Sequence, residues 1–358
     1  LYSLSVPSVP SLRPLCPNLL WMEGPMKSAR MKGGGVVECV EEIAPVPGAG
    51  EVVIETRISA LCGSEMKTYR GKGQALGNPG HEAAGVVVQL GVGVNTLHLG
   101  QRVGVSAISC CGHCEYCAKG QYTWCPNRKF YGNMHAERFL TAANACHILP
   151  DDLSWEVGVL VTGDGFGVPY HTSLKLRNPK IATIAIFGMG PIGLGNLLMQ
   201  RYLGRDIIAV DISAQRLELA EELGATHLVQ AGEGSDVIGE IRRLTQGKGS
   251  DACIEAVGRP ETAKQCFAAV RTAGTVVFNG EQPAVELSPS EDFIRRDISA
   301  VGSWYYHFSE YPEMLALYRA GLPIDKLITH HFPLSDIGEG YRLMDAGQTG
   351  KVLIHYKT

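Results

Sequence analysis

The residues with the most distinctive chemistry are four cysteines in the first half of the chain, in the pattern C-x2-C-x2-C-x7-C. Thiolates at these spacings are typical ligands of a tetrahedral Zn²⁺. A site with four thiolates is closed, so we expect it to hold a surface lobe of about residues 108–127 and to do no chemistry. Cys110 offers a second allowed register, but the two even gaps that start at Cys111 favour the first. The predicted structural ligands are Cys111, Cys114, Cys117 and Cys125.

A second set of metal-binding residue types lies upstream of the four cysteines. Cys62 is followed two positions later by the hydroxyl of Ser64, and His81 is followed directly by the carboxylate of Glu82. Catalytic zinc sites use three protein ligands and leave one position for water or substrate. Taken alone, a histidine such as His81 is more often structural, and a cysteine such as Cys62 is more often a buried thiol. The residue types by themselves therefore give only a candidate for a catalytic zinc site.

A glycine fingerprint for a dinucleotide lies in the second half. The run G-M-G-P-I-G follows an apolar stretch and opens a predicted helix, the context in which G-x-G-x-x-G binds pyrophosphate. Asp211 ends the next predicted strand, where an acid accepts hydrogen bonds from the ribose hydroxyls and repels a 2′-phosphate. Arg216 lies close enough to hold such a phosphate, but Asp211 sits at the contact point, which favours NAD over NADP. The predicted cofactor-binding residues here are Gly188, Gly190, Pro191, Ile192, Gly193, Asp211 and Arg216.

The elements that must position these groups follow two patterns. Short alternating strands with Gly and Pro between them, from about residue 35 to 175, predict a β-rich, barrel-like domain. From about residue 180, apolar strands alternate with helices, which predicts βαβ units and a doubly wound parallel sheet. The tail after about residue 309 is too short for a domain, and we expect it to pack on the first one. Predicted strands of the parallel sheet are 183–187, 207–210, 252–257, 275–278 and 299–301.

Together these motifs resemble those of the zinc-dependent medium-chain alcohol and polyol dehydrogenases, the group that includes sorbitol and threonine dehydrogenases. The resemblance covers roughly residues 30–358. It implies an α/β protein with a GroES-like catalytic domain (26–175), a Rossmann NAD-binding domain (176–309) and a C-terminal return to the catalytic domain (310–358). It also implies two zinc ions per chain and a homodimer or homotetramer.

The implied activity is a reversible hydride transfer between an alcohol and NAD. The alcohol would be a polyol, a secondary alcohol or an amino alcohol, and the carbonyl compound would be the substrate of the reverse reaction. Formaldehyde or threonine dehydrogenation is an alternative within the family. A non-catalytic protein that binds NAD and zinc is the alternative outside it.

The resemblance also implies roles for single residues. Asp164, which lies between two glycines like a turn residue, matches the position of a third ligand of the catalytic zinc, beside Cys62 and His81. Ser64 matches the hydroxyl that starts the proton relay from the substrate. Glu82 either binds the zinc or lies next to its ligands, because members of the family differ at this point.

Three further positions depart from the family pattern or are less specific. Glu65 stands where many members have an Asp that orients the ligand histidine. Lys67 replaces a histidine that ends the relay in some alcohol dehydrogenases, so the relay must end in another way. Lys351 matches a basic residue near the pyrophosphate in some relatives, although a solvated strand lysine is about as common.

Composition excludes several other partners. A net charge of −4 over 358 residues gives no basic surface for nucleic acid or an anionic membrane, and no apolar run is long enough to span a bilayer. Because the 11 cysteines lie in metal-like or scattered apolar contexts, we expect a reducing, cytoplasmic location. Residues 1–25 lack a clear targeting signature and predict a disordered leader.

Overall fold

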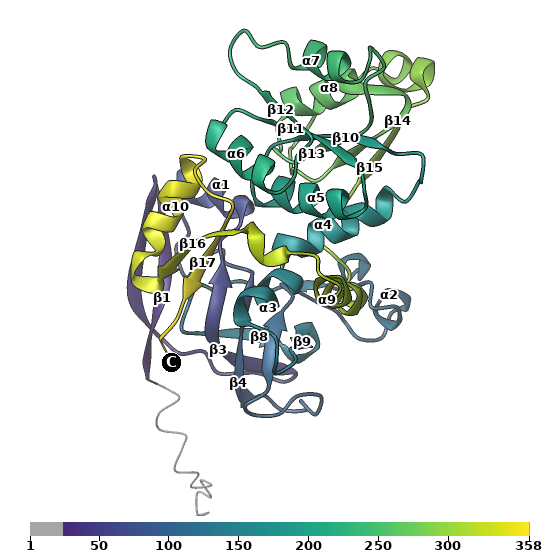
Figure 1. The fold of residues 1–358 in the computed structure, drawn as a ribbon. Coiled ribbons are helices and arrows are strands. Elements are labelled where there is room, and N and C mark those ends of the chain that lie inside the picture. Colours follow the sequence, from purple (N-terminus) through teal and green to yellow (C-terminus); the bar gives the residue numbers. More distant parts are fainter. Residues whose placement is uncertain (1–23, 358) are drawn as a thin grey trace, which may run out of the picture.

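The computed structural model describes residues 24–357, which form two parts that stand one above the other (Figure 1). The predicted leader, residues 1–25, therefore lies outside the described residues except for its last two. In the described part of the chain, no helix is both long and apolar enough to cross a membrane.

A seven-stranded sheet with the strand order β16-β17-β3-β4-β5-β9 organises the first part, and β8 pairs with β3 beside it. Its inner face is apolar, with Val52, Val87 and Phe139 fully buried. β1 (Pro25–Gly33) and β2 (Val36–Ile43) form a separate antiparallel hairpin. The strands of the large sheet are β3 (Glu51–Ala60), β4 (Ala83–Leu90), β5 (Arg102–Val105), β8 (Arg138–Ala142), β9 (Cys146–Ile148), β16 (Ile328–Pro333) and β17 (Lys351–His355).

The second part is a parallel sheet of six strands in the order β12-β11-β10-β13-β14-β15, which confirms the predicted doubly wound architecture. Its central strand β10 has four buried residues out of five, as expected for a strand covered on both faces. The sequence does not indicate β12, because three of its four side chains are exposed. The strands are β10 (Thr183–Phe187), β11 (Asp206–Asp211), β12 (His227–Gln230), β13 (Ser250–Glu255), β14 (Val270–Phe278) and β15 (Ser299–Gly302).

Helices cover both sheets, and two of them are important for the site. α4 (Asp164–Lys175) leads from the first part towards the second, and α5 (Pro191–Tyr202) begins directly after the glycine fingerprint. The other helices are α1 (Met66–Arg70), α2 (Glu115–Ala118), α3 (Trp155–Val161), α6 (Ala214–Glu222), α7 (Val237–Leu244), α8 (Pro260–Ala269), α9 (Tyr311–Arg319) and α10 (Ile337–Asp345).

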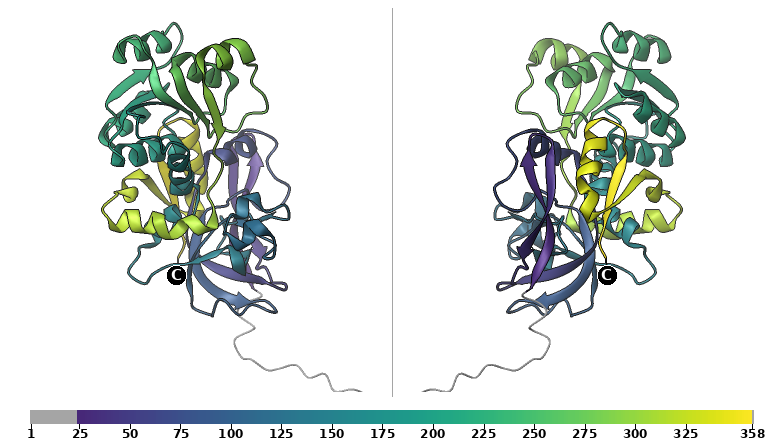
Figure 2. Two further views of the ribbon diagram at one scale, coloured as in Figure 1. Left: turned by 90° about the vertical axis from the view of Figure 1, so that its right-hand side faces the viewer. Right: turned by 90° about the vertical axis from the view of Figure 1, so that its left-hand side faces the viewer.

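The C-terminal segment returns to the first sheet. β17 pairs antiparallel with β3, with Leu353 opposite Ala60, and both side views show the yellow C-terminal strands beside the first part (Figure 2). The backbone N–H of Leu61 donates to the carbonyl of Val352, and that of Ala60 donates to the carbonyl of Glu82. The end of β3, the start of β4 and the start of β17 are therefore held side by side.

Candidate active site

Four of the sequence-predicted residues meet in one cluster where those three strand ends converge on α4. Cys62 follows β3, His81 and Glu82 precede β4, and Asp164 is the first residue of α4. One ligand atom of each lies within 4.8 Å of the others. Asp164 Oδ2 is 3.3 Å from His81 Nε2 and 3.5 Å from Cys62 Sγ. The fold therefore brings together residues that are about a hundred positions apart in the sequence.

The donor atoms of this cluster fit a zinc ion. His81 Nδ1 lies 2.9 Å from the carbonyl of Pro79 and can donate its N–H there, which leaves Nε2, 3.3 Å from Asp164 Oδ2, as the nitrogen that faces the cluster. Within the described residues, Asp164 Oδ1 is buried without a hydrogen-bond partner. Burial acts to lower the pKa of His81, but Cys62 and Asp164 raise it well above its usual value. A cluster that attracts a proton so strongly is one that a divalent cation would stabilise.

A buried carboxylate lies behind the ring of His81. Glu65 Oε1 lies 3.4 Å from His81 Nδ1, while its Oε2 accepts from Tyr341 at 2.6 Å and lies 3.3 Å from His135 Nε2. Burial alone would raise the pKa of Glu65, but His135, His81 and Tyr341 lower it to about 2. The carboxylate is thus ionised and held through Oε2, whereas Oε1 has no hydrogen-bond partner among the described residues. His135 and Tyr341 have no sequence signal, because they reach the site from distant elements.

Glu82 and Lys351 form a buried ion pair beside the cluster. Lys351 Nζ lies 2.5 Å from Glu82 Oε1, and the exposed fractions of the two side chains are 1% and 0%. Glu82 Oε2 accepts from the backbone N–H of Gly165 in the first turn of α4. Both oxygens of Glu82 are therefore engaged. The sequence predicts that Lys351 lies near the pyrophosphate, whereas its side chain contacts Glu82. The reason is that β17 pairs with β3, which places Lys351, the first residue of β17, beside the cluster of Cys62, His81 and Asp164.

Ser64 lies on the accessible side of the same cluster. Its Oγ is 3.3 Å from Cys62 Sγ and 3.5 Å from His81 Nε2, and the residue is exposed. Lys67, one turn further along, is also exposed. The hydroxyl of Ser64 is thus the polar group through which a proton could pass from the cluster to water.

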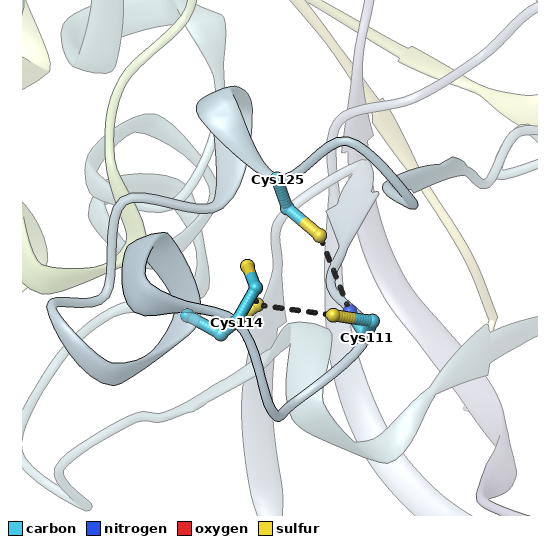
Figure 3. Close-up of side chains that lie close together, drawn as sticks. Cys111, Cys114 and Cys125 are labelled. Carbon is cyan, nitrogen blue, oxygen red and sulfur yellow. Dashed lines mark hydrogen bonds between the residues drawn. The ribbon is translucent and has the colours of Figure 1, made fainter.

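The four cysteines of the surface lobe also converge, and Figure 3 shows three of them facing one centre. Cys114 Sγ is 3.3 Å and Cys111 Sγ is 3.7 Å from Cys117 Sγ, and the Cys125 sulfur completes the group within 4.8 Å. Cys110 is outside this group, in agreement with the register chosen from the sequence. The pKa of Cys111 is lowered to about 6, and the largest cause is the hydrogen bond from the backbone N–H of His113. The lowered pKa favours the thiolate, which is the form that binds metal.

The glycine fingerprint forms the turn between β10 and α5. Gly188 has φ +93°, and a Cβ on Gly193 would lie 1.7 Å from the carbonyl oxygen of Gly188, so neither position accepts a side chain. A Cβ on Gly190 would meet nothing within 4 Å. Local packing therefore does not require a glycine at position 190. The space next to Gly190 is open, and it lies at the N-terminus of α5, where a pyrophosphate binds in such folds.

Asp211 and Arg216 lie at the end of β11 and in α6. Asp211 accepts from the backbone N–H groups of Met189 at 2.6 Å and Ser213 at 2.8 Å, so its carboxylate is held next to the fingerprint turn. Arg216 is half-buried and extends towards the C-terminal segment, with Nη2 3.4 Å from the carbonyl of Met344. Burial lowers the pKa of Arg216. Of the two side chains, Asp211 is the one that contacts the fingerprint turn directly.

A cavity of 400 Å³ opens at the carboxyl ends of β14 and β15. Asn279, Ser303 and Trp304 line it, and so do residues of α4 and of the cysteine lobe. The cavity therefore lies between the second part of the molecule, α4 and the lobe.

Two family models match the chain in the places that this geometry indicates. The alcohol dehydrogenase GroES-like domain matches residues 48–151, and the zinc-binding dehydrogenase model matches residues 191–320. A sorbitol dehydrogenase of Bombyx mori is 31% identical over 334 residues, which cover 88% of this chain and 94% of the relative. The chain belongs to the zinc-dependent medium-chain alcohol and polyol dehydrogenase family.

Two other proteins show how far the similarity to this family extends. An L-threonine 3-dehydrogenase of Pyrococcus horikoshii is 31% identical over 343 residues, with 92% of this chain and 97% of the relative covered. The solved structure of an Escherichia coli alcohol dehydrogenase (rspB) with NADH has a TM-score of 0.80 at 25% identity, with 92% and 99% covered. The chain is a zinc-dependent alcohol oxidoreductase whose cofactors are zinc and NAD, which confirms the predicted fold and enzyme class.

Proposed function

We propose that this protein oxidises a secondary alcohol or polyol with NAD at the cluster of Cys62, His81 and Asp164. The proposal rests on the geometry of this cluster. A thiol, an imidazole and a carboxylate have ligand atoms within 4.8 Å of one another, and one carboxylate oxygen, Asp164 Oδ1, has no hydrogen-bond partner among the described residues. The accessible hydroxyl of Ser64 lies next to them. Zinc held there supplies a Lewis acid that lowers the pKa of an alcohol hydroxyl, and NAD supplies the hydride acceptor.

The protein's own residues then orient the substrate and move its proton. Ser64 Oγ accepts the hydrogen bond of the substrate hydroxyl and passes a proton towards solvent as the carbonyl forms. The carbonyl of Pro79 keeps His81 turned towards the cluster, and Glu65 places a negative charge behind the ring. Glu82 keeps the first turn of α4, which carries Asp164, in place. Glu82 thus acts through its two hydrogen-bonded partners and not as a ligand. The four cysteines of the lobe hold a second, structural zinc.

The assay that tests this proposal follows NADH formation with a panel of polyols, amino alcohols and primary alcohols. Turnover with a polyol or secondary alcohol supports it. Turnover restricted to threonine or to formaldehyde would select one of the alternatives within the family. A zinc-loaded protein that forms no NADH with any alcohol would favour the non-catalytic alternative. We further propose a cytoplasmic location, which is supported by the ten free cysteines among the described residues, and a homodimer or homotetramer, which rests on the family resemblance alone.

The cofactor preference gives a prediction for Asp211. We expect Asp211→Gly to raise KM for NAD by about 10–100-fold, because the adenosine ribose loses a charge-assisted hydrogen-bond acceptor worth about 1.5–3 kcal/mol. KM for NADP should change far less, since a carboxylate that repels the 2′-phosphate is lost at the same time. Steady-state kinetics with both cofactors measures this shift.

Asp206→Gly is the matched control, because Asp206 is an exposed residue at the opposite end of the same strand. It should leave both KM values near those of the wild type. An Asp211→Gly protein with an unchanged ratio of the two KM values would refute the proposed role of Asp211.

A further inference from the structure

A third group of metal-binding side chains lies away from both zinc clusters. His171 is in α4, seven positions after Asp164, while His307 and Glu310 lie in the segment between β15 and α9. All three are buried, and one ligand atom of each lies within 4.8 Å of the others. His171 Nδ1 is 2.8 Å from Glu310 Oε1 and 3.1 Å from Oε2. None of the three has a role in the oxidation proposed above.

His307 carries the observation that points to a ligand. Its Nδ1 lies 2.8 Å from Thr123 Oγ1, whereas its Nε2 is one of the buried atoms in residues 24–357 that have no hydrogen-bond partner. The residue is only 5% exposed, so water does not freely satisfy this nitrogen. The His307 side chain also accepts the backbone N–H of Glu310, and Glu310 Oε2 accepts the backbone N–H of His307 at 3.0 Å. A cation on Nε2 requires the tautomer whose Nδ1–H donates to Thr123 Oγ1, which is the arrangement found in histidines that bind metals.

The geometry and charge of the group suit a small divalent cation. At Zn–N and Zn–O distances of about 2.0–2.2 Å, tetrahedral ligands lie about 3.4 Å apart, so only small shifts would be needed. Glu310 contributes one negative charge. Lys175 and Glu281 both line the adjoining 400 Å³ cavity, and Lys175 brings a positive charge near His307 that opposes the charge of Glu310. His171 and Thr123 line the same cavity, which leaves a route for the cation and room for a water as fourth ligand.

We propose that His171, His307 and Glu310 form a third metal site, which takes a divalent cation of the zinc type through two imidazoles and a carboxylate. The site joins α4 to the segment after β15, and through Thr123 it reaches the cysteine lobe. A bound cation therefore links three elements around the cavity and stabilises their arrangement. Because it shares no ligand with the other two clusters, it can be filled or lost independently of them.

Titration with Co²⁺ tests the site on the full protein whose two thiolate-containing sites are already filled with zinc. We expect one further equivalent to bind and to add visible d–d absorption without a thiolate-to-cobalt charge-transfer band, because the three ligands contain no sulfur. The thermal midpoint should rise with the same stoichiometry. Failure to bind a third equivalent, or a third equivalent that brings a thiolate band, would overturn the proposal.

Two variants and a control locate the binding. His307→Gln should lose the third equivalent. Thr123→Val keeps all three ligands and removes only the partner of His307 Nδ1, so its affinity for Co²⁺ should fall by about 10–100-fold. His98→Gln, at an exposed loop histidine, should bind as the wild type does. If His307→Gln does not fold, Thr123→Val decides alone. Wild-type affinity in a folded His307→Gln or in Thr123→Val would show adventitious binding elsewhere and would contradict the site.

Discussion

A His81→Ala protein is expected to remain folded while its rate of alcohol oxidation falls by at least about 10³-fold. The imidazole provides one of the three donors of the proposed catalytic site, so the variant should lose the zinc of that site. Lewis-acid stabilisation of the developing charge is worth several kcal/mol, and 4 kcal/mol corresponds to about 10³-fold in rate. Metal analysis, NADH formation and circular dichroism on one preparation measure zinc content, rate and folding together.

The structural zinc serves as an internal reference in this experiment. In the proposed assignment it is held by Cys111, Cys114, Cys117 and Cys125, none of which belongs to the cluster of His81, and it should stay bound in the variant. His98→Ala, at an exposed histidine, should retain full activity and all of its metal. A His81→Ala protein that lacks the zinc but turns over at the wild-type rate would refute the assignment of the catalytic site.

The second large effect is expected on stability. Lys351→Met removes one partner of an ion pair that is almost fully buried, and it leaves the carboxylate of Glu82 without its countercharge. Breaking such a pair from one side costs about 3–5 kcal/mol. For a domain of this size the thermal midpoint should fall by about 6–20 °C. Thermal unfolding followed by circular dichroism measures this shift.

A double variant separates the lost pair from lost packing. Lys351→Met combined with Glu82→Gln removes the unpaired charge, so we expect it to recover most of the midpoint lost by Lys351→Met alone. Lys326→Met is the matched control, because Lys326 is exposed, and it should shift the midpoint little. If Lys351→Met melts like Lys326→Met, the pair is not important for stability.

Much of the fold follows from local patterns in the sequence. The apolar run Thr183–Phe187 and the glycine turn after it predict a buried parallel strand followed by a helix, and both are present. Period-2 alternation likewise predicts β3 and β4. β12 escapes detection because a short edge strand with exposed side chains has no apolar pattern. The strands that are central in a sheet are thus predictable, since burial on both faces constrains their residue types.

The site is predictable only in part, because its chemistry depends on long-range pairing. Cys62 and His81 are candidates from residue type and neighbours, whereas Asp164 needs the family resemblance to be read as a ligand. Glu65 is expected near His81, but its contact with Tyr341 depends on α10 packing beside the first sheet. The pairing of β17 with β3 likewise determines where Lys351 lies, and no local signal near Lys351 encodes that register.

The most direct test of the central claim is a crystal structure of the zinc-loaded protein with NAD, measured on both sides of the zinc absorption edge. The account predicts an anomalous peak within about 2.0–2.3 Å of Cys62 Sγ, His81 Nε2 and an oxygen of Asp164. It also predicts that Lys351 remains on Glu82 in that structure. A protein that forms NADH from an alcohol but shows no anomalous peak at this cluster would contradict the account.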